Sequence, residues 1–123
     1  MRATEEGNLE TVLSLIAEDA VFLLPDQPPM RGREAFAATL RSALGQVRIE
    51  GKPDIQEIRV AGDYAFCWNE LSLTATPLQG GPAQRRAGPT LSVFRKERDG
   101  RWILVRDAEH AQNSMNAWLV RKG

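Results

Sequence analysis

The chain has 123 residues, of which 42% are hydrophobic and 26% are charged, and this is the size and composition of one globular domain. Sixteen basic residues balance sixteen acidic ones, which argues against a nucleic-acid binder and against a polybasic membrane anchor. The single cysteine, Cys67, and a short N-terminus with two acids and no apolar run predict a cytoplasmic protein without a signal peptide.

Two helices are expected in the first part of the chain. Apolar residues recur at helical spacing after Asn8, a good helix N-cap: Leu9, Val12, Leu13 and Ile16. This pattern predicts a helix that ends near Glu18, followed by a short strand over residues 20–24 and a proline-rich loop. A second apolar stripe predicts a helix over residues 33–44, which Gly45 ends.

The rest of the chain alternates like β-structure. The predicted strands span residues 47–50, 54–60, 64–76, 90–98 and 101–108. Residues 51–53 are expected to interrupt the first two strands, and residues 77–89 to form a long loop or a frayed hairpin end. Asp99-Gly100 predicts a hairpin turn. Two helices followed by largely antiparallel strands indicate an α+β domain, with helices on one face of a curved sheet.

Several segments in this order resemble a known family. They are residues 7–13, 17–22, 31–36 and 91–96, and the Asp-Gly-Arg-Trp hairpin that precedes Arg106-Asp107. The set resembles the SnoaL-like branch of the nuclear transport factor 2-like superfamily. It is most similar to a bacterial subfamily labelled as oxidoreductases of polyketide and enediyne pathways. The resemblance covers residues 7–110 and implies a cone-shaped antiparallel sheet wrapped around N-terminal helices. The chain departs from the family pattern in its first helix, which is expected to be short or truncated.

The resemblance divides the chain into a cone-fold domain, residues 1–110, and a tail, residues 111–123. In the tail, Met115, Trp118 and Leu119 share one helical face, so the tail either packs as a short amphipathic helix or is disordered. The family also forms homodimers through the outer face of its sheet. Apolar residues expected on that face are Leu91, Val93 and Leu104.

Steroid isomerases of this fold provide a test for one reaction. Their catalytic base corresponds to Leu24 here, and their protonated acid corresponds to Ser92. Most of the helix that carries their tyrosine donor is missing. Because the groups that isomerisation needs are replaced, the comparison argues against a steroid isomerase of that type.

Asp107 is the preferred catalytic candidate, because a SnoaL-type cyclase uses an aspartate as general acid/base on a polyketide carbonyl. Strand alternation places Thr90 on the same face as Ser92, and Val105 and Glu109 on the same face as Asp107. An apolar pocket would raise the pKa of Asp107 toward neutrality. The alternative is a structural ion pair of Asp107 with one of three arginines: Arg31, Arg33 or Arg106.

Other residues complete the expected pocket. On the strand 64–76, Trp68 and Glu70 share one face, while Cys67 and Asn69 share the other; the pattern does not decide which face points inward. Trp68 and Glu70 are preferred as an aromatic wall and a polar group, although Trp68 also suits a core or a dimer interface. The remaining pocket candidates come from the first strand and the loop after it: Phe22, Leu24 and Asp26.

No cofactor or metal is predicted. Gly80-Gly81 belongs to no phosphate-binding glycine pattern. His110 is the only histidine, and on a strand it would point away from Asp107 and Glu109, so the ligands for a metal are lacking.

Two functions remain open. The first is a small-molecule enzyme that uses acid/base chemistry on an apolar, carbonyl-bearing, polyketide-like compound. The alternative is a non-catalytic ligand-binding or protein-interaction module, its pocket filled by aromatic side chains: Phe22, Phe36, Phe66 and Trp68. Two or more polar groups that converge around an empty cavity in the cone would favour the enzyme.

Overall fold

The computed structural model describes residues 9–109 and 112–113. The helices are α2 (Leu9–Ser14) and α3 (Arg33–Leu44). The strands are β1 (Ile16–Leu23), β2 (Met30–Arg31), β3 (Val47–Ala61), β4 (Tyr64–Pro77), β5 (Gln84–Lys96), β6 (Trp102–Glu109) and β7 (Gln112–Asn113). His110 and the expected tail helix with Trp118 lie outside the described residues. No helix in the described ranges is long and apolar enough to cross a membrane.

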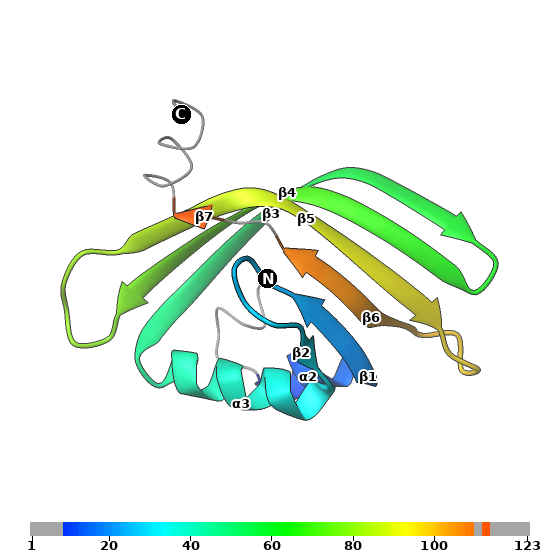
Figure 1. The fold of residues 1–123 in the computed structure, drawn as a ribbon, viewed down its shortest axis with the longest axis horizontal. Coiled ribbons are helices and arrows are strands. Elements are labelled where there is room, and N and C mark those ends of the chain that lie inside the picture. Colours follow the sequence, from blue (N-terminus) through cyan, green and yellow to red (C-terminus); the bar gives the residue numbers. More distant parts are fainter. Residues whose placement is uncertain (1–8, 110–111, 114–123) are drawn as a thin grey trace.

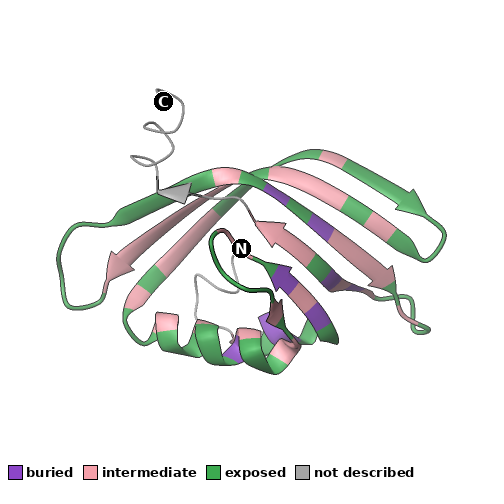
Figure 2. Cartoon of the chain, in the orientation of Figure 1, coloured by how far each residue is buried: buried purple, intermediate pink, exposed green. Residues whose placement is uncertain are grey.

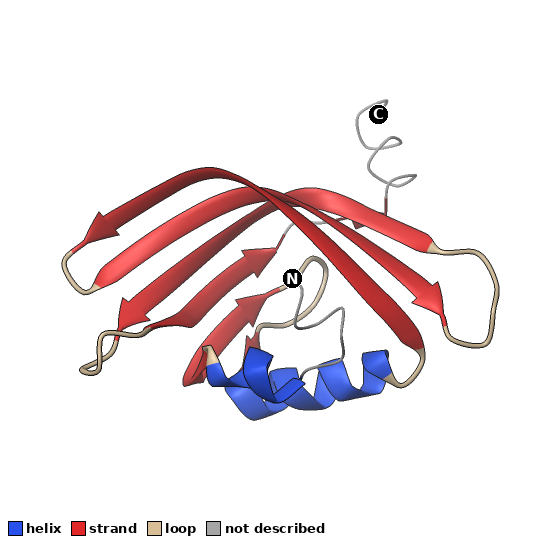
Figure 3. Ribbon diagram, turned by 180° about the vertical axis from the view of Figure 1, so that it is seen from behind, coloured by secondary structure: helices blue, strands red, loops and turns tan. Residues whose placement is uncertain are grey.

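The described strands form one curved, unclosed sheet in the order β2-β1-β6-β5-β4-β3, and β7 pairs with β5. The sheet arches over both helices, which lie together on its concave side (Figures 1 and 3). All the pairings are antiparallel except that of β1 with β6. This architecture confirms the expected α+β cone, in which the helices cover one face of a curved sheet.

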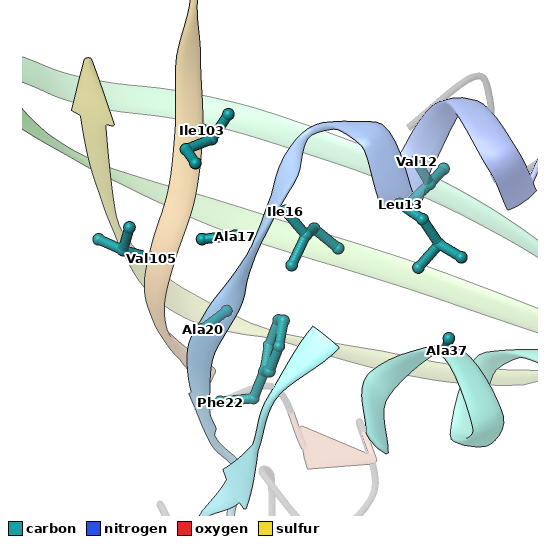
Figure 4. Packing of buried hydrophobic residues seen from close by; sticks show 9 residues of the cluster. All are labelled: Val12, Leu13, Ile16, Ala17, Ala20, Phe22, Ala37, Ile103 and Val105. Atoms are coloured by element: carbon teal, nitrogen blue, oxygen red, sulfur yellow. The ribbon is translucent and has the colours of Figure 1, made fainter. Parts of the chain in front are cut away.

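The hydrophobic core lies between the helices and the strands β1 and β6. Its buried residues are Val12, Leu13, Ile16, Ala17, Ala20, Phe22, Ala37, Ile103 and Val105 (Figure 4). Phe22 stacks on Phe36 of α3, with ring centroids 4.5 Å apart, and Ala37 allows α3 a close approach because its side chain is small and fully buried. Buried positions thin out toward β3 and β4 (Figure 2), so much of the concave face is not covered by the described helices.

The first helix is shorter than its sequence pattern predicts. It ends at Ser14 instead of Glu18, and β1 begins at Ile16 instead of residue 20. The Leu104 amide donates to the Leu15 carbonyl at 2.8 Å, which ties this segment to β6. Ile16 fits the helical spacing but is buried equally well as a strand residue, so the apolar pattern alone could not separate the two structures.

The predicted interruption at residues 51–53 is also wrong. β3 runs without a break, and Pro53 pairs with Leu71 of β4. β3 is the edge strand of the described sheet, where a residue without an N–H need not break the ladder of hydrogen bonds. The loop expected over residues 77–89 is shorter than predicted, because β5 already begins at Gln84.

A β-bulge between the β5 residues Val93 and Phe94 shifts the register against β6. Val93 and Leu104, which were expected on the outer face, are partly buried and pack against the core, whereas Leu91 is 44% exposed. The register still pairs Val93 with Phe66, on the face opposite Ser92, so its partial burial does not remove it from the outer face.

Candidate functional site

Asp107 and Ser92 form the centre of the candidate site. They lie directly opposite each other on β6 and β5, and the Ser92 Oγ donates a hydrogen bond of 2.6 Å to Asp107 Oδ1. On the other side, Asp107 pairs in register with Phe22 of β1. Phe22 belongs to the core beneath the helices, so this row of residues lies on the concave face.

This environment changes the acidity of Asp107. Burial raises the pKa of its carboxyl to about 6, against the hydrogen bond from Ser92, which lowers it; the neighbouring Glu109 carboxylate raises it further. A carboxyl with a pKa near 6 is mostly ionised at neutral pH and returns easily to its acid form. It can therefore both accept and donate a proton.

A second row of polar residues lies beside the first. Asn69 of β4 is opposite Thr90 of β5, and Thr90 is opposite Glu109 of β6. Burial raises the pKa of Glu109, while Arg86, whose Nη2 lies 3.1 Å from the Glu109 carboxylate, lowers it. The buried atoms Asn69 Oδ1 and Thr90 Oγ1 have no hydrogen-bond partner within the described part of the chain.

The strand register decides which face of β4 belongs to the site. Cys67 lies opposite Ser92, and Asn69 lies opposite Thr90, so both residues are on the concave face. Trp68 and Glu70 are opposite Leu91 and Pro89, on the outer face. The preference for Trp68 and Glu70 as inward-facing residues is therefore corrected, because alternation gives two faces but not the side on which the helices pack.

The remaining predicted residues are placed as follows. Thr90, Ser92 and Val105 are buried, and Val105 is part of the core. Leu24 lies just beyond β1 and is partly buried. Asp26 is exposed in the following loop with a positive φ of 59°, as suits a turn-forming aspartate.

Sequence reasoning assigned no role to Asn69 or Arg86. Asn69 was on the face that was not chosen, and only pairing with β5 brings it beside Thr90. Arg86 lies 23 residues from its partner Glu109 in the sequence. The apolar-polar pattern of one strand contains no signal for such contacts.

The structural alternative for Asp107 is not found in the described residues. Arg33 pairs with Glu18 at 3.4 Å, and Arg106 donates to the backbone carbonyls of Asp19 and Val105. None of the three arginines considered forms an ion pair with Asp107. The same described ranges contain no group of three or more His, Cys, Asp or Glu side chains placed to hold a metal ion.

A separate hollow of about 440 Å³ lies between α3, the start of β1 and the β5–β6 hairpin. Its lining includes Arg33 and Arg95, which already pair with acidic side chains around the hollow. This hollow differs from the row of Asp107 in its chemistry. Its arginines form exposed ion pairs, whereas the site on the concave face contains buried polar atoms without partners in the described ranges.

Comparison with known proteins agrees with this fold. The SnoaL-like domain family model matches residues 1–105. A conserved protein from Planctomyces limnophilus is 32% identical, with 91% of this chain and 87% of that chain covered and a TM-score of 0.87. A ketosteroid isomerase-like protein from Erwinia carotovora is 23% identical, with 87% and 83% covered and a TM-score of 0.74.

A third solved structure, ActVI-ORFA from Streptomyces coelicolor, is 13% identical, with 94% of this chain and 89% of that chain covered and a TM-score of 0.72. No curated protein matches the chain at a significant level. At these identities the second and third structures establish the shared fold alone.

Proposed function

The chain belongs to the SnoaL-like domain family, and we propose that it binds an apolar, carbonyl-bearing, polyketide-like small molecule and acts on it by acid/base chemistry. The observation that carries the proposal is the placement of Asp107, a partly buried carboxyl between Phe22 and Ser92 with a pKa of about 6.

In the proposed reaction, Asp107 acts first as a general base. Its carboxylate takes a proton from the carbon next to the substrate carbonyl. The C–H bond breaks, its electron pair moves into the new carbon–carbon double bond, and the carbonyl oxygen gains the negative charge of an enolate. Asp107, now protonated, returns the proton to the enolate or to a product formed from it, which restores the carboxylate.

The neighbours of Asp107 support this role. The Ser92 hydroxyl holds the carboxylate by one oxygen, which fixes its orientation without neutralising it. Phe22, in register with Asp107, is buried in the core, so it gives the carboxyl an apolar neighbour.

The non-catalytic alternative required a cone filled with aromatic side chains. Phe22 and Phe36 do stack in the core, but Phe66 and Trp68 pair with β5 residues of the outer face. Polar side chains converge on the concave face instead: Asn69, Thr90, Ser92, Asp107 and Glu109. This convergence supplies the polar groups that the enzyme requires.

Proton exchange tests the proposal without knowledge of the product. We expect the protein to accelerate the exchange of the α-protons of 1-tetralone, an apolar aromatic ketone, in deuterated buffer, measured by proton NMR. Asp107→Asn should reduce this acceleration by about 10²- to 10⁴-fold. Asp54→Asn, an exposed aspartate of β3, is the matched control and should leave it unchanged. Equal exchange by wild type and Asp107→Asn would favour the non-catalytic module.

We also propose that the protein is a cytoplasmic homodimer. The outer face of the sheet presents apolar side chains in adjacent register pairs, Trp68 with Leu91 and Phe66 with Val93. Leu91 is 44% exposed and Phe66 is 37% exposed, and an apolar sheet face of this kind is usually covered. The free thiol of Cys67 fits a reducing compartment.

A further inference from the structure

The row Asn69–Thr90–Glu109 contains two buried polar atoms that the described fold leaves without partners. Thr90 is only 6% exposed, and its Oγ1 and Asn69 Oδ1 bond neither each other nor another group in the described ranges. A buried polar atom without a hydrogen bond costs stability, typically about 1–3 kcal/mol. Such a cost is tolerated where a ligand supplies the missing bond.

The chemistry of these two atoms selects the partner. Asn69 Oδ1 can only accept a hydrogen bond, so the ligand must donate one. The Thr90 hydroxyl can donate in return, so the same ligand group should also accept. An alcohol or phenol does both, whereas a carbonyl or an ether only accepts and an ammonium only donates. A carboxylate would in addition be repelled by the neighbouring acids, Asp107 and Glu109.

We propose that Asn69 and Thr90 form a hydroxyl-binding subsite that positions the substrate against Asp107. The inference rests on the proposed function and narrows its substrate class to hydroxylated carbonyl compounds. Thr90 precedes Ser92 by two residues on the same face of β5, a spacing of about 7 Å along a strand. The subsite therefore lies about 7 Å along β5 from the row of Ser92 and Asp107, a separation on the order of the width of two fused rings.

A matched set of small ketones tests the subsite. The probes are 6-hydroxy-1-tetralone, 1-tetralone and 6-methoxy-1-tetralone, with dissociation constants measured by isothermal titration calorimetry. Wild type should bind the hydroxy compound about tenfold more tightly than the other two, as expected for one well-formed hydrogen-bonding pair. Asn69→Leu and Thr90→Val, which keep the shape of each side chain, should remove this preference. Thr74→Val, the same exchange on the outer face of β4, is the control and should retain it.

The ligand-free proteins give a second readout. If the Thr90 hydroxyl lacks a partner, Thr90→Val should melt at or above the wild-type temperature, because an unsatisfied polar atom is replaced by a methyl group. If the melting temperature of Thr90→Val fell by about 3 °C or more, the Thr90 hydroxyl would already have a hydrogen-bond partner, namely bound water. That result would overturn the subsite. Equal affinity for all three ketones, or failure of all three to bind, would overturn it as well.

The two proposals fail in different ways. If wild type preferred the hydroxy ketone through Thr90 but did not accelerate proton exchange, the subsite would be retained and the acid/base function would be refuted. Proton exchange that depends on Asp107, with no hydroxyl preference, would retain the function and refute the subsite.

Discussion

At the scale of single residues, burial of Asp107 couples the stability of the fold to pH. The carboxyl has a pKa of about 6 in the folded chain and its ordinary, lower pKa in the unfolded chain. The folded state therefore binds the proton more tightly. The stability that this binding contributes is present at low pH and is lost as the pH rises through 6.

Asp107→Asn should consequently be more stable than wild type at pH 8, because the amide is never charged. Moving a carboxyl pKa from about 3.9 to about 6 corresponds to roughly 3 kcal/mol, which is the expected upper limit of the gain. Below pH 4 the two proteins should unfold alike. Urea unfolding at pH 4, 6 and 8 measures the difference, and a variant that is less stable than wild type at pH 8 would contradict the assignment.

Ser92→Ala should raise the pKa of Asp107 further, because the hydroxyl that stabilises the carboxylate is removed while the burial remains. The measurement is a carboxyl ¹³C titration by NMR, supported by the acid limb of the exchange rate against pH, which should move to higher pH. Ser72→Ala, on the outer face of β4, should leave both unchanged. An unchanged or lowered pKa of Asp107 in Ser92→Ala would show that the hydrogen bond does not act on its acidity.

At the scale of elements, the contact of α3 with β1 holds the helix over the concave face. Phe36 stacks on Phe22, which is itself in register with Asp107, so the helix and the site share one packing surface. Gly32, at a φ of 93°, donates its amide to the Ala20 carbonyl at 2.7 Å and fixes the start of α3 against β1.

Phe36→Ala should lower the free energy of unfolding by about 2–3 kcal/mol, because it removes the stacked ring and leaves a cavity beside Phe22. Unfolding in guanidinium chloride measures the loss. Thr39→Ala, at an exposed position of α3, should change stability by less than about 0.5 kcal/mol. If Phe36→Ala were as stable as wild type, α3 would not depend on this contact.

The elements differ in how well their sequences predict them. The helix predicted over residues 33–44 has the same bounds in the structure, because its apolar stripe is bounded by Gly32 and Gly45. β1 was predicted too short, because Ile16 satisfies two periodicities at once. The uninterrupted β3 could not be foreseen, because the sequence alone does not show that Pro53 is on an edge strand.

The same limit applies to the candidate site. Alternation within one strand correctly groups Thr90 with Ser92, because no bulge separates them. It could not choose between Trp68 and Asn69, since that choice depends on which side of the sheet the helices cover. The Asp99-Gly100 hairpin turn joined the strand of Ser92 to the strand of Asp107, and the catalytic role of Asp107 stays a prediction.

At the scale of the whole molecule, the outer face determines the predicted assembly. Leu91→Lys should convert the proposed dimer to a monomer, because it places a charge among Trp68, Phe66 and Val93. Light scattering coupled to size-exclusion chromatography at micromolar concentration measures the mass. Leu78→Lys, at a 59% exposed position between β4 and β5, should leave the mass unchanged. A wild-type monomer would refute the dimer directly.

The parallel pairing of β1 with β6 has a consequence for synthesis in the cell. Arg106 donates to the carbonyl of Asp19, 87 residues earlier, so the edge of β1 that faces β6 stays unpaired until the last long strand exists. Closing so large a loop is slow, and it exposes β1 in the meantime. While the ribosome is still producing β3 to β5, the apolar side chains of β1 lack their neighbour and are open to association with other chains. The nascent protein is therefore most vulnerable to aggregation just before β6 emerges, and slow codons placed immediately ahead of β6 would lengthen that interval.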